Sequence, residues 1–279
     1  MGSYFCGWYY RCQSDQHTLA VIPSLHRTPE SNFCMIQLIT DADAFQAVFP
    51  YSAFQKDGPR IRIAKNCFGP SGIHLNLCQA GFRAAGDLRF GPFTPLRYDI
   101  MGPFQYLPLM QCRHSISSMR HTVDGTLTVN GMAYVFQHGA GYLEGDRGRS
   151  FPKKYLWTCS NVPNGTVMLS VAEIPLGLVR FTGVIGVVLL NGKEYRLASY
   201  LGARAVSIQP QEIVIRQGSL CLTVRRHPVL GHPLRAPVSG FMRRTIHEHP
   251  SCVVFYHFED QEQVLLDYHA PNASFEYEY

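Results

Sequence analysis

The sequence predicts an all-β protein, on three observations. Apolar and polar residues alternate with a period of two in several stretches, which is typical of strands with one buried face. Turn-forming pairs such as Asp57-Gly58 and Asn130-Gly131 fall between these stretches, as they do in antiparallel hairpins. No stretch shows sustained helical periodicity. We therefore expect an antiparallel sandwich or barrel.

In chain order, the predicted elements begin with an aromatic strand over residues 4–12. The only short helices that the sequence allows are expected near residues 42–49 and 199–206. The alternating strands are residues 60–63, 126–129, 212–216, 220–224 and 253–258. Glycine and proline are spread through the chain instead of gathering in one linker, so each strand is expected to end at a turn.

A weak internal sequence similarity predicts that the chain consists of two similar units. The opening segment, residues 4–12, resembles residues 151–159, because both begin with aromatic residues and contain Trp followed by Cys. Residues 140–144 similarly resemble the closing residues 273–277. Each unit would begin and end with an aromatic strand. We place the two domains at residues 1–145 and 146–279.

The composition excludes several classes of protein. With 46% hydrophobic residues the chain has enough apolar mass to fold, which argues against disorder. The longest apolar run, residues 181–190, is too short to span a membrane as a helix. The opening residues do not resemble a signal peptide, so a cytoplasmic location is expected. The net charge of +5 comes from scattered basic residues, so nucleic acid is not an expected partner.

The cysteines and histidines do not predict a metal site. Nine widely spaced cysteines form no CxxC pair and are interpreted as buried free thiols. His247 and His249 would share one strand face, but no third ligand is suggested nearby. Motifs of serine hydrolases, P-loop proteins and dinucleotide-binding enzymes are absent from the sequence. We therefore expect neither a metal nor an organic cofactor.

Several irregular segments resemble the tocopherol cyclase family and its bacterial relatives. The resemblance extends along the chain in the family's order, and its most specific parts are the Met-Gly-Pro-Phe and Asp-x-Gly-x-Ser-Phe-Pro segments. This chain has Cys6 where the family commonly has Glu, and Arg147 where plant members have Trp. The segments that carry the resemblance are residues 7–10, 99–121, 142–153, 157–161 and 275–279.

The resemblance implies two tandem lipocalin-like (calycin-type) antiparallel β-barrel or half-barrel units. It also implies that a hydrophobic isoprenoid-type substrate, such as a prenylated quinol, undergoes acid-catalysed cyclisation or hydration without a cofactor. That activity belongs to the isomerase or lyase classes. The alternative to an enzyme is a non-catalytic carrier protein for a lipid or hydrophobic metabolite. A third hypothesis is a structural relic that binds no ligand. Peripheral membrane contact would suit a lipid-handling protein, although no basic amphipathic helix supports it.

Acid catalysis on an isoprenoid double bond needs a proton donor that stays protonated near neutral pH. Asp146 and Glu144 are the first candidates, because their i, i+2 spacing puts both carboxyls on one strand face and raises one pKa. The rival interpretation is a structural ion pair of Asp146 with Arg147, Arg149 or Lys153. A carboxylate paired with a cation would be a poor donor, so the two interpretations exclude each other.

Two histidines are candidates for a proton relay. His114 and His121 are seven residues apart and would face opposite sides of an uninterrupted strand, although a bulge between them would reverse this. A hydrogen-bonded structural role is the alternative for each.

Aromatic side chains can stabilise a carbocation over their faces. Trp8, Tyr9 and Trp157, at the openings of the two predicted units, are candidates for substrate binding, together with Phe104 and Tyr106 of the Met-Gly-Pro-Phe segment. The alternative is core packing, because large aromatic residues often plug the ends of barrels.

Overall fold

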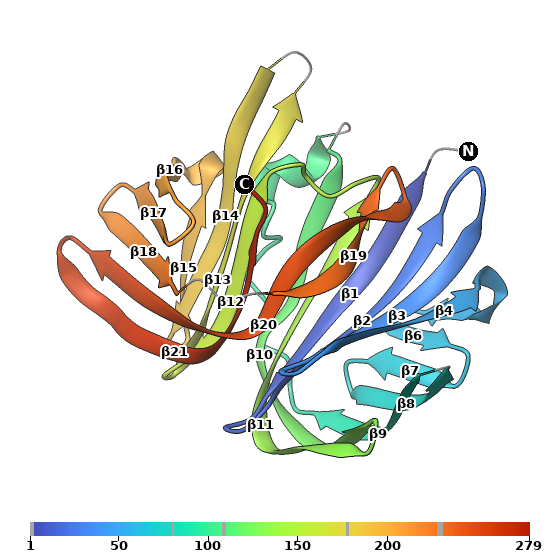
Figure 1. Ribbon diagram of the computed structural model, residues 1–279. Helices are drawn as coiled ribbons and strands as arrows, with labels where there is room; N and C mark the ends of the chain where they lie inside the picture. Colours follow the sequence, from blue (N-terminus) through green and yellow to red (C-terminus); the bar gives the residue numbers. More distant parts are fainter. Residues whose placement is uncertain (1–2, 80, 108–109, 177–178, 228–230) are drawn as a thin grey trace. The chain divides into compact units, whose positions relative to one another are not determined.

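The computed structural model describes residues 3–79, 81–107, 110–176, 179–227 and 231–279. These residues form strands and short 3₁₀ turns and contain no α-helix, which confirms the predicted all-β class (Figure 1). The three 3₁₀ turns are η1 (Tyr51–Ala53), η2 (Gly102–Tyr106) and η3 (Ser199–Leu201).

Eleven strands form the first sheet, in the order β4-β3-β2-β1-β11-β10-β9-β8-β7-β6-β5. Their ladders are antiparallel throughout, as the hairpin signals predict. The strands are β1 (Tyr4–Gln13), β2 (Thr18–Arg27), β3 (Asn32–Thr40), β4 (Ala44–Pro50), β5 (Phe54–Asp57), β6 (Arg60–Ile63), β7 (Asn66–Gly69), β8 (Gly72–Gln79), β9 (Phe82–Phe90), β10 (Cys112–Val129) and β11 (Met132–Gly148).

Ten strands form the second sheet, in the order β15-β14-β13-β12-β21-β20-β18-β17-β16, with β19 paired to β20 outside this path. The strands are β12 (Tyr155–Val162), β13 (Gly165–Leu176), β14 (Val179–Leu190), β15 (Lys193–Ala198), β16 (Arg204–Ile208), β17 (Glu212–Gln217), β18 (Leu220–Arg226), β19 (His232–Val238), β20 (Phe241–Asp260) and β21 (Gln263–Tyr277).

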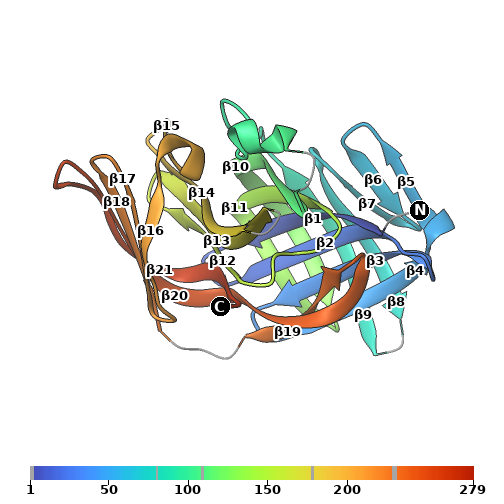
Figure 2. The same cartoon turned by 90° about the horizontal axis from the view of Figure 1, so that it is seen from above.

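The two sheets share one topology, which agrees with the internal similarity between the two halves of the sequence. In each, the first strand lies beside the last, as β1 does beside β11 and β12 beside β21. Figure 2 shows the same pattern within each sheet from above. The end strands β4 and β5 are joined only through η1, and β15 and β16 only through η3, with no ladder between them among the described residues. Each sheet is therefore an open half-barrel.

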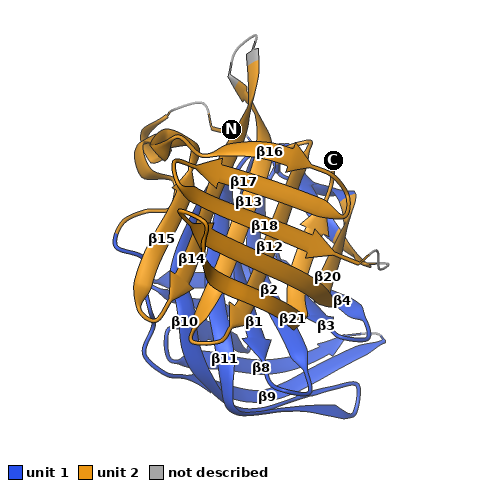
Figure 3. Cartoon of the chain, turned by 90° about the vertical axis from the view of Figure 1, so that its left-hand side faces the viewer, with its two compact units in different colours: residues 1–97, 112–151, 235–244 blue, residues 98–111, 152–234, 245–279 orange. Residues whose placement is uncertain are grey.

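The chain divides into two compact units that do not follow a single cut (Figure 3). The first consists of residues 1–97, 112–151 and 235–244, and the second of residues 98–111, 152–234 and 245–279. The predicted boundary between residues 145 and 146 falls inside β11, and the first unit continues to Phe151. Residues 98–111, which include the Met-Gly-Pro-Phe segment, belong to the second unit.

Each sheet buries one apolar face. The core of the first unit includes Tyr10 and Cys12 of β1 and Leu143 of β11, which alternate with polar neighbours as the period of two predicts. The opposite face of β1 is also buried, because Tyr9 and Arg11 are nearly inaccessible. Residues 9–12 of β1 are therefore buried on both faces of the strand.

Two predicted turns have the conformation that their residues favour. Asn130-Gly131 connects β10 to β11 and Asn191-Gly192 connects β14 to β15, with all four residues at positive φ. The helix expected near residues 42–49 is wrong, because residues 44–50 form β4, whose residues pair with β3. The helix expected near residues 199–206 is reduced to the 3₁₀ turn η3, followed by the strand β16.

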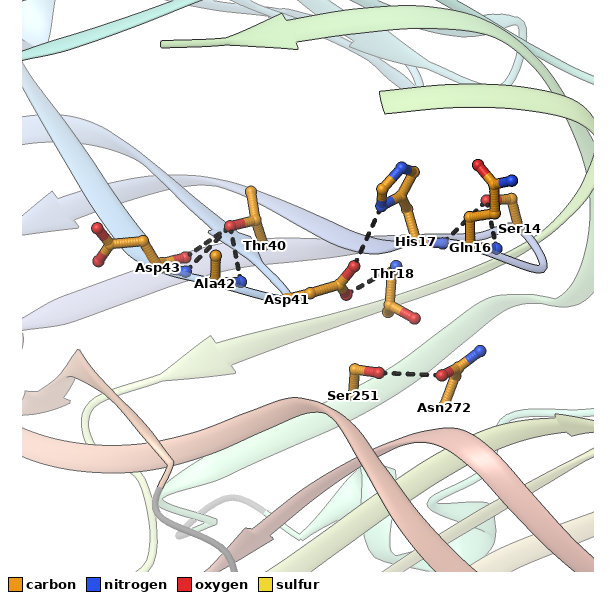
Figure 4. A network of polar contacts seen from close by, with 10 residues as sticks. All are labelled: Ser14, Gln16, His17, Thr18, Thr40, Asp41, Ala42, Asp43, Ser251 and Asn272. Atoms are coloured by element: carbon orange, nitrogen blue, oxygen red, sulfur yellow. Dashed lines mark hydrogen bonds and ion pairs between the residues drawn. The ribbon is translucent and has the colours of Figure 1, made fainter. Parts of the chain in front are cut away.

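Polar contacts fix the turns at one end of the first unit (Figure 4). Asp41, in the β3–β4 turn, accepts a hydrogen bond from the backbone N–H of Thr18 at 2.8 Å and lies 3.4 Å from Nδ1 of His17. The hydroxyl of Ser14 accepts a bond from the backbone N–H of His17 at 3.1 Å. In the second unit, Ser251 donates to Asn272 at 3.1 Å. Asp41 and Ser14 thus satisfy backbone N–H groups that the turns leave unpaired, whereas the Ser251–Asn272 bond joins two side chains.

In the described part of the chain, no helix has the length and apolar character needed to cross a membrane.

Candidate active site

Strands β10 and β11 place three titratable side chains on one face of the first sheet. His114 of β10 is the cross-strand partner of Asp146, and Ile116 is the partner of Glu144. Glu144 and Asp146 are two residues apart on β11 and therefore share a face, as their spacing predicts. This face is opposite to the one that Leu143 contributes to the core.

The imidazole of His114 lies between the two carboxyls. Its Nδ1 is 3.0 Å from Oδ1 of Asp146, and its Nε2 is 3.2 Å from Oε2 of Glu144. The Nδ1 contact is a hydrogen bond, whereas Nε2 has no hydrogen-bond partner among the described residues and approaches Glu144 only as an ion pair. Tyr142, on the same face of β11, donates its hydroxyl to Oε2 of Glu144 at 2.5 Å.

The two carboxylates determine the charge of His114. Burial by itself lowers the pKa of His114, because it removes water from the charged ring. The charges of Glu144 and Asp146 and the hydrogen bond to Asp146 outweigh this and raise the pKa well above the usual value of 6.5. The side chain is only 11% exposed. His114 is therefore a buried imidazolium at neutral pH.

The cation beside Asp146 is this histidine. Arg147, one of the cations considered from the sequence, is the cross-strand partner of Cys6 and Arg113, and its side chain is directed to the other face of β11. Cys112 also contacts Asp146, with Sγ 3.4 Å from Oδ1. Burial and the charge of Asp146 raise the pKa of the Cys112 thiol well above its usual value, so it stays protonated.

His121 lies on the opposite face of β10 from His114. Its cross-strand partner is Gly141, and a Cβ on this glycine would overlap the imidazole ring. The ring packs between Phe90 and Phe93, at centroid distances of 4.6 and 4.7 Å. Burial lowers the pKa of His121 to about 4, so it is uncharged at neutral pH. The structure therefore does not bring His121 to the cluster of His114, Glu144 and Asp146.

The predicted aromatic residues of the first unit divide between the two faces of β1. Tyr9 is the cross-strand partner of Glu144 and lies on the face that carries the cluster. Trp8 alternates with it, points to the other face and packs against the core, where it stacks on Phe54 at a centroid distance of 6.4 Å. Of Trp8 and Tyr9, only Tyr9 lies beside the cluster of His114, Glu144 and Asp146.

The remaining aromatic candidates belong to the second unit. Trp157 is buried on β12, as the cross-strand partner of Glu276. Phe104 of η2 packs on Tyr200 at 5.6 Å and on Phe181 at 6.1 Å, and Tyr106 is 79% exposed.

Arg196 explains why the segment that contains η2 belongs to the second unit. Its guanidinium donates to the backbone carbonyls of Tyr98 and Asp99, both at 2.9 Å, and lies over the Tyr98 ring at 3.6 Å. Glu194, 2.7 Å away, balances its charge. The Met-Gly-Pro-Phe segment follows directly, and its Phe104 packs on Tyr200 of the same unit.

Three groups of polar residues were not predicted from the sequence. Tyr142, which bonds Glu144, had a weak signal in its i, i+2 spacing from that residue. Ser24 and His26 have the same spacing on β2, and Nε2 of His26 lies 2.8 Å from Oγ of Ser24. The second unit holds a buried pair of glutamates, Glu248 and Glu276, which are cross-strand partners. The hydroxyl of Tyr155 donates to Glu276 at 2.6 Å.

The cluster in the first unit also contains the only described group of three residues that could hold a metal ion. His114, Glu144 and Asp146 each offer one ligand atom, and the three atoms lie within 4.8 Å of one another. However, His114 faces each carboxylate with a different ring nitrogen, and a metal can take only one of them. A metal would also have to displace the proton that the two carboxylates hold on the ring. The arrangement suits proton transfer better than metal binding.

Comparisons with known proteins show the fold. No family model and no curated protein matches the sequence. Among solved structures, a protein assigned as AttH from Nitrosomonas europaea aligns with 100% of this chain and 93% of its own, at 10% identity and a TM-score of 0.59. Kievitone hydratase from Nectria haematococca aligns with 99% and 89%, at 10% identity and a TM-score of 0.54. CghA in complex with Sch210972 aligns with 99% and 88%, at 10% identity and a TM-score of 0.62.

These alignments cover almost the whole chain, so both half-barrels and their order along the chain are shared with the three proteins. At 10% identity the likeness concerns the fold and leaves the chemistry to the residues of this chain. The tocopherol cyclase family, to which the sequence segments pointed, is not among these three structures. The chain has the two-unit fold of AttH, kievitone hydratase and CghA.

Proposed function

We propose that this protein is a cofactor-free enzyme that promotes cyclisation or hydration of a hydrophobic substrate by proton transfer from His114. The observation that carries the proposal is the position of this imidazolium between Asp146 and Glu144, at 3.0 and 3.2 Å, on a buried sheet face. Buried titratable groups with shifted pKa values are typical of catalytic sites.

The two ring nitrogens have different tasks in this proposal. Nδ1 donates to Asp146, which fixes the orientation of the ring and keeps it protonated. Nε2 carries the proton that is transferred, because it makes no well-aligned hydrogen bond among the described residues. Glu144 lies next to Nε2 and is held by Tyr142, so it can relay the proton to a substrate atom.

The reaction is balanced without an oxidant or a metal. The Nε2 proton, relayed through Glu144, adds to one carbon of a substrate double bond, which leaves a carbocation on the other carbon and neutral imidazole on the protein. A substrate hydroxyl then closes a ring on the carbocation, or a water molecule adds to it. The oxygen releases its proton, and His114 takes up a proton for the next turnover. Tyr9, beside Glu144, would stabilise the cation with its ring.

Two proteins of the same fold support the proposal of an enzyme that acts on a small molecule. One is named a hydratase, and the other was solved with a small molecule bound. The sequence resemblance to the tocopherol cyclase family suggests an isoprenoid-type substrate such as a prenylated quinol. The carrier hypothesis lacks a comparable observation, since a charged buried cluster contributes nothing to holding an apolar ligand.

The test uses geranylhydroquinone as the candidate substrate and mass spectrometry to detect ring closure or gain of water. We expect conversion by the wild-type protein and loss of at least about 100-fold in His114→Gln, which removes the proton donor. His74→Gln is the matched control, because it alters a similar His–Asp contact of 2.8 Å that is largely exposed. Equal turnover by wild-type protein and His114→Gln would refute the assignment of the acid. Tight binding without conversion would favour the carrier.

A further inference from the structure

Two 3₁₀ turns of the second unit carry exposed apolar side chains. The turns η2 and η3 lie side by side (Figure 2), and the ring of Phe104 packs edge-on against that of Tyr200 at a centroid distance of 5.6 Å. Tyr106, the last residue of η2, is 79% exposed, and Leu201, the last residue of η3, is 47% exposed. Single exposed apolar side chains are ordinary, whereas a group of them marks an interaction surface.

A third exposed side chain adjoins these turns. Tyr98 is 49% exposed, and the guanidinium of Arg196 lies over its ring at 3.6 Å. The same guanidinium donates to the hydroxyl of Tyr200 at 3.1 Å, so Tyr98 is held beside η3. The exposed side chains of this region therefore rest on one framework, which consists of Arg196, Tyr200 and Phe104.

Two arginines face each other across the ladder that follows η3. Arg204 begins β16 and is the cross-strand partner of Arg216 of β17. Both side chains are exposed, and neither has an acidic partner within the described part of the chain. Like charges directly opposite each other in a ladder are destabilising. The pair therefore favours an anion that comes from outside the chain.

The arginines are close to the exposed turns. Arg204 follows Leu201 by three residues, which span at most about 11 Å of chain. The carboxylate of Asp99, next to Tyr98 in the chain, accepts a hydrogen bond from the backbone N–H of Met101 at 2.8 Å. We name the following five residues the η3 surface: Tyr98, Tyr106, Leu201, Arg204 and Arg216.

We propose that the η3 surface docks the protein on a membrane that contains anionic lipids. The tyrosine and leucine side chains bury in the region between headgroups and acyl chains, where amphipathic aromatic rings are favoured. The two guanidinium groups bind lipid phosphate and carboxylate groups, to which their planar fork is suited. The surface is formed by two turns that are distant in the sequence, so no amphipathic helix is needed. It concerns where the protein meets hydrophobic molecules, and it does not depend on the chemistry of His114.

Charge favours a lipid surface over a second copy of this chain. Two copies that met through the η3 surface about a two-fold axis would bring the same arginines of each copy together. Like charges across an interface oppose association. An anionic membrane instead attracts each arginine, and each such contact tightens binding about fivefold. The net charge of +5 acts in the same direction.

The test measures co-sedimentation of the wild-type protein with phosphatidylcholine vesicles, either alone or with about 30% phosphatidylserine. We expect at least about tenfold tighter binding to the anionic vesicles, because two arginines contribute about fivefold each. Raising the salt concentration from about 0.1 M to 1 M shortens the screening length from about 10 Å to 3 Å and should remove most of this difference. Equal binding to both kinds of vesicle, or binding to neither, overturns the proposal.

Matched substitutions locate the contact on the molecule. Arg216→Gln should weaken binding to the anionic vesicles about fivefold, whereas Arg62→Gln, at an exposed position of β6 in the first unit, should leave it unchanged. Leu201→Gln should also weaken binding about fivefold, because about half of a leucine side chain leaves water on docking. Val48→Gln, at a similarly exposed position of β4, is its control. Equal losses in the variants and their controls overturn the η3 surface as the contact.

A tryptophan at the surface reports contact with the lipid directly. Trp157 is buried and Trp8 packs against the core, so the emission of Tyr106→Trp should shift to shorter wavelength with anionic vesicles and be quenched by brominated acyl chains. Val48→Trp should show neither effect. Unchanged emission from Tyr106→Trp overturns the proposal. A dimer that forms without lipid and dissociates in Leu201→Gln, measured by sedimentation velocity, would also overturn it, because the occupant is then a second copy.

Discussion

Replacement of Asp146 by asparagine should release His114 from one of the two charges that keep it protonated. The variant keeps the size of the side chain and a hydrogen-bond acceptor but removes the negative charge 3.0 Å from Nδ1. A hydrogen bond to a charged group contributes about 1.5–3 kcal/mol, and one pKa unit corresponds to about 1.4 kcal/mol. We therefore expect the pKa of His114 to fall by roughly one to two units.

The measurement is an NMR pH titration of ¹³C-labelled histidine rings, with the His114 signal assigned from its loss in His114→Gln. In the wild-type protein this signal should remain in its protonated position at pH 7, because its pKa lies well above 6.5. In Asp146→Asn the titration should move toward neutral pH. A His114 signal that titrates near 6.5 in the wild-type protein, or that is the same in both proteins, would refute the reasoning.

The same charge pair makes a prediction about stability. A histidine with a raised pKa stabilises the folded state fully below its unfolded pKa of about 6.5, and the stabilisation is lost as pH rises through the folded pKa. The difference in unfolding free energy between wild-type protein and Asp146→Asn should therefore be larger at pH 6 than at pH 9.5. Urea denaturation at both pH values gives the difference, and Asp87→Asn, at an exposed pair, should show little change.

Three further outcomes are expected from other parts of the structure. Burial lowers the pKa of His121 to about 4, so its contribution to stability is lost as pH falls from 6.5 toward 4, and His121→Phe should reduce that loss in urea denaturation at pH 7 and 4.5. Gly141→Ala would overlap the His121 ring and should cost about 1–3 kcal/mol in the same assay, and no change would refute the position of the ring. Arg196→Leu removes the bonds to the carbonyls of Tyr98 and Asp99, so limited proteolysis should cut residues 98–111 faster than in the wild-type protein.

Much of the fold could be predicted from the sequence because strands and hairpins leave local signals. The alternation over residues 60–63 and 126–129 and the Asn-Gly turns correspond to observed strands and turns. The secondary structure of residues 42–49 is ambiguous in the sequence, because their apolar spacing also suits a helix. They form β4 because pairing with β3 satisfies their backbone, and tertiary context of this kind is not visible in a local window.

The candidate site could be predicted only in part, because it depends on which strands are neighbours. The spacing of Glu144 and Asp146 on one strand is a local property, and their shared face followed from it. The contact of Asp146 with His114 spans 32 positions in the chain and depends on the register of β10 and β11.

The different roles of His114 and His121 depend on the bulges of β10. His114 and His121 are seven positions apart on β10, but their partners on β11, Asp146 and Gly141, are only five positions apart, because the ladder shifts register twice between them. Each shift adds one residue to β10 and reverses the facing of the residues beyond it, so two shifts restore the original alternation. A single bulge would have put His121 on the polar face with His114. With two bulges, one histidine is held charged by acids while the other stays neutral among phenylalanines, on opposite faces of one strand. The deletion of one residue between Ile116 and His121 should therefore disturb the cluster more than any conservative substitution there, since it would change the facing of every residue of β10 on one side of the deletion.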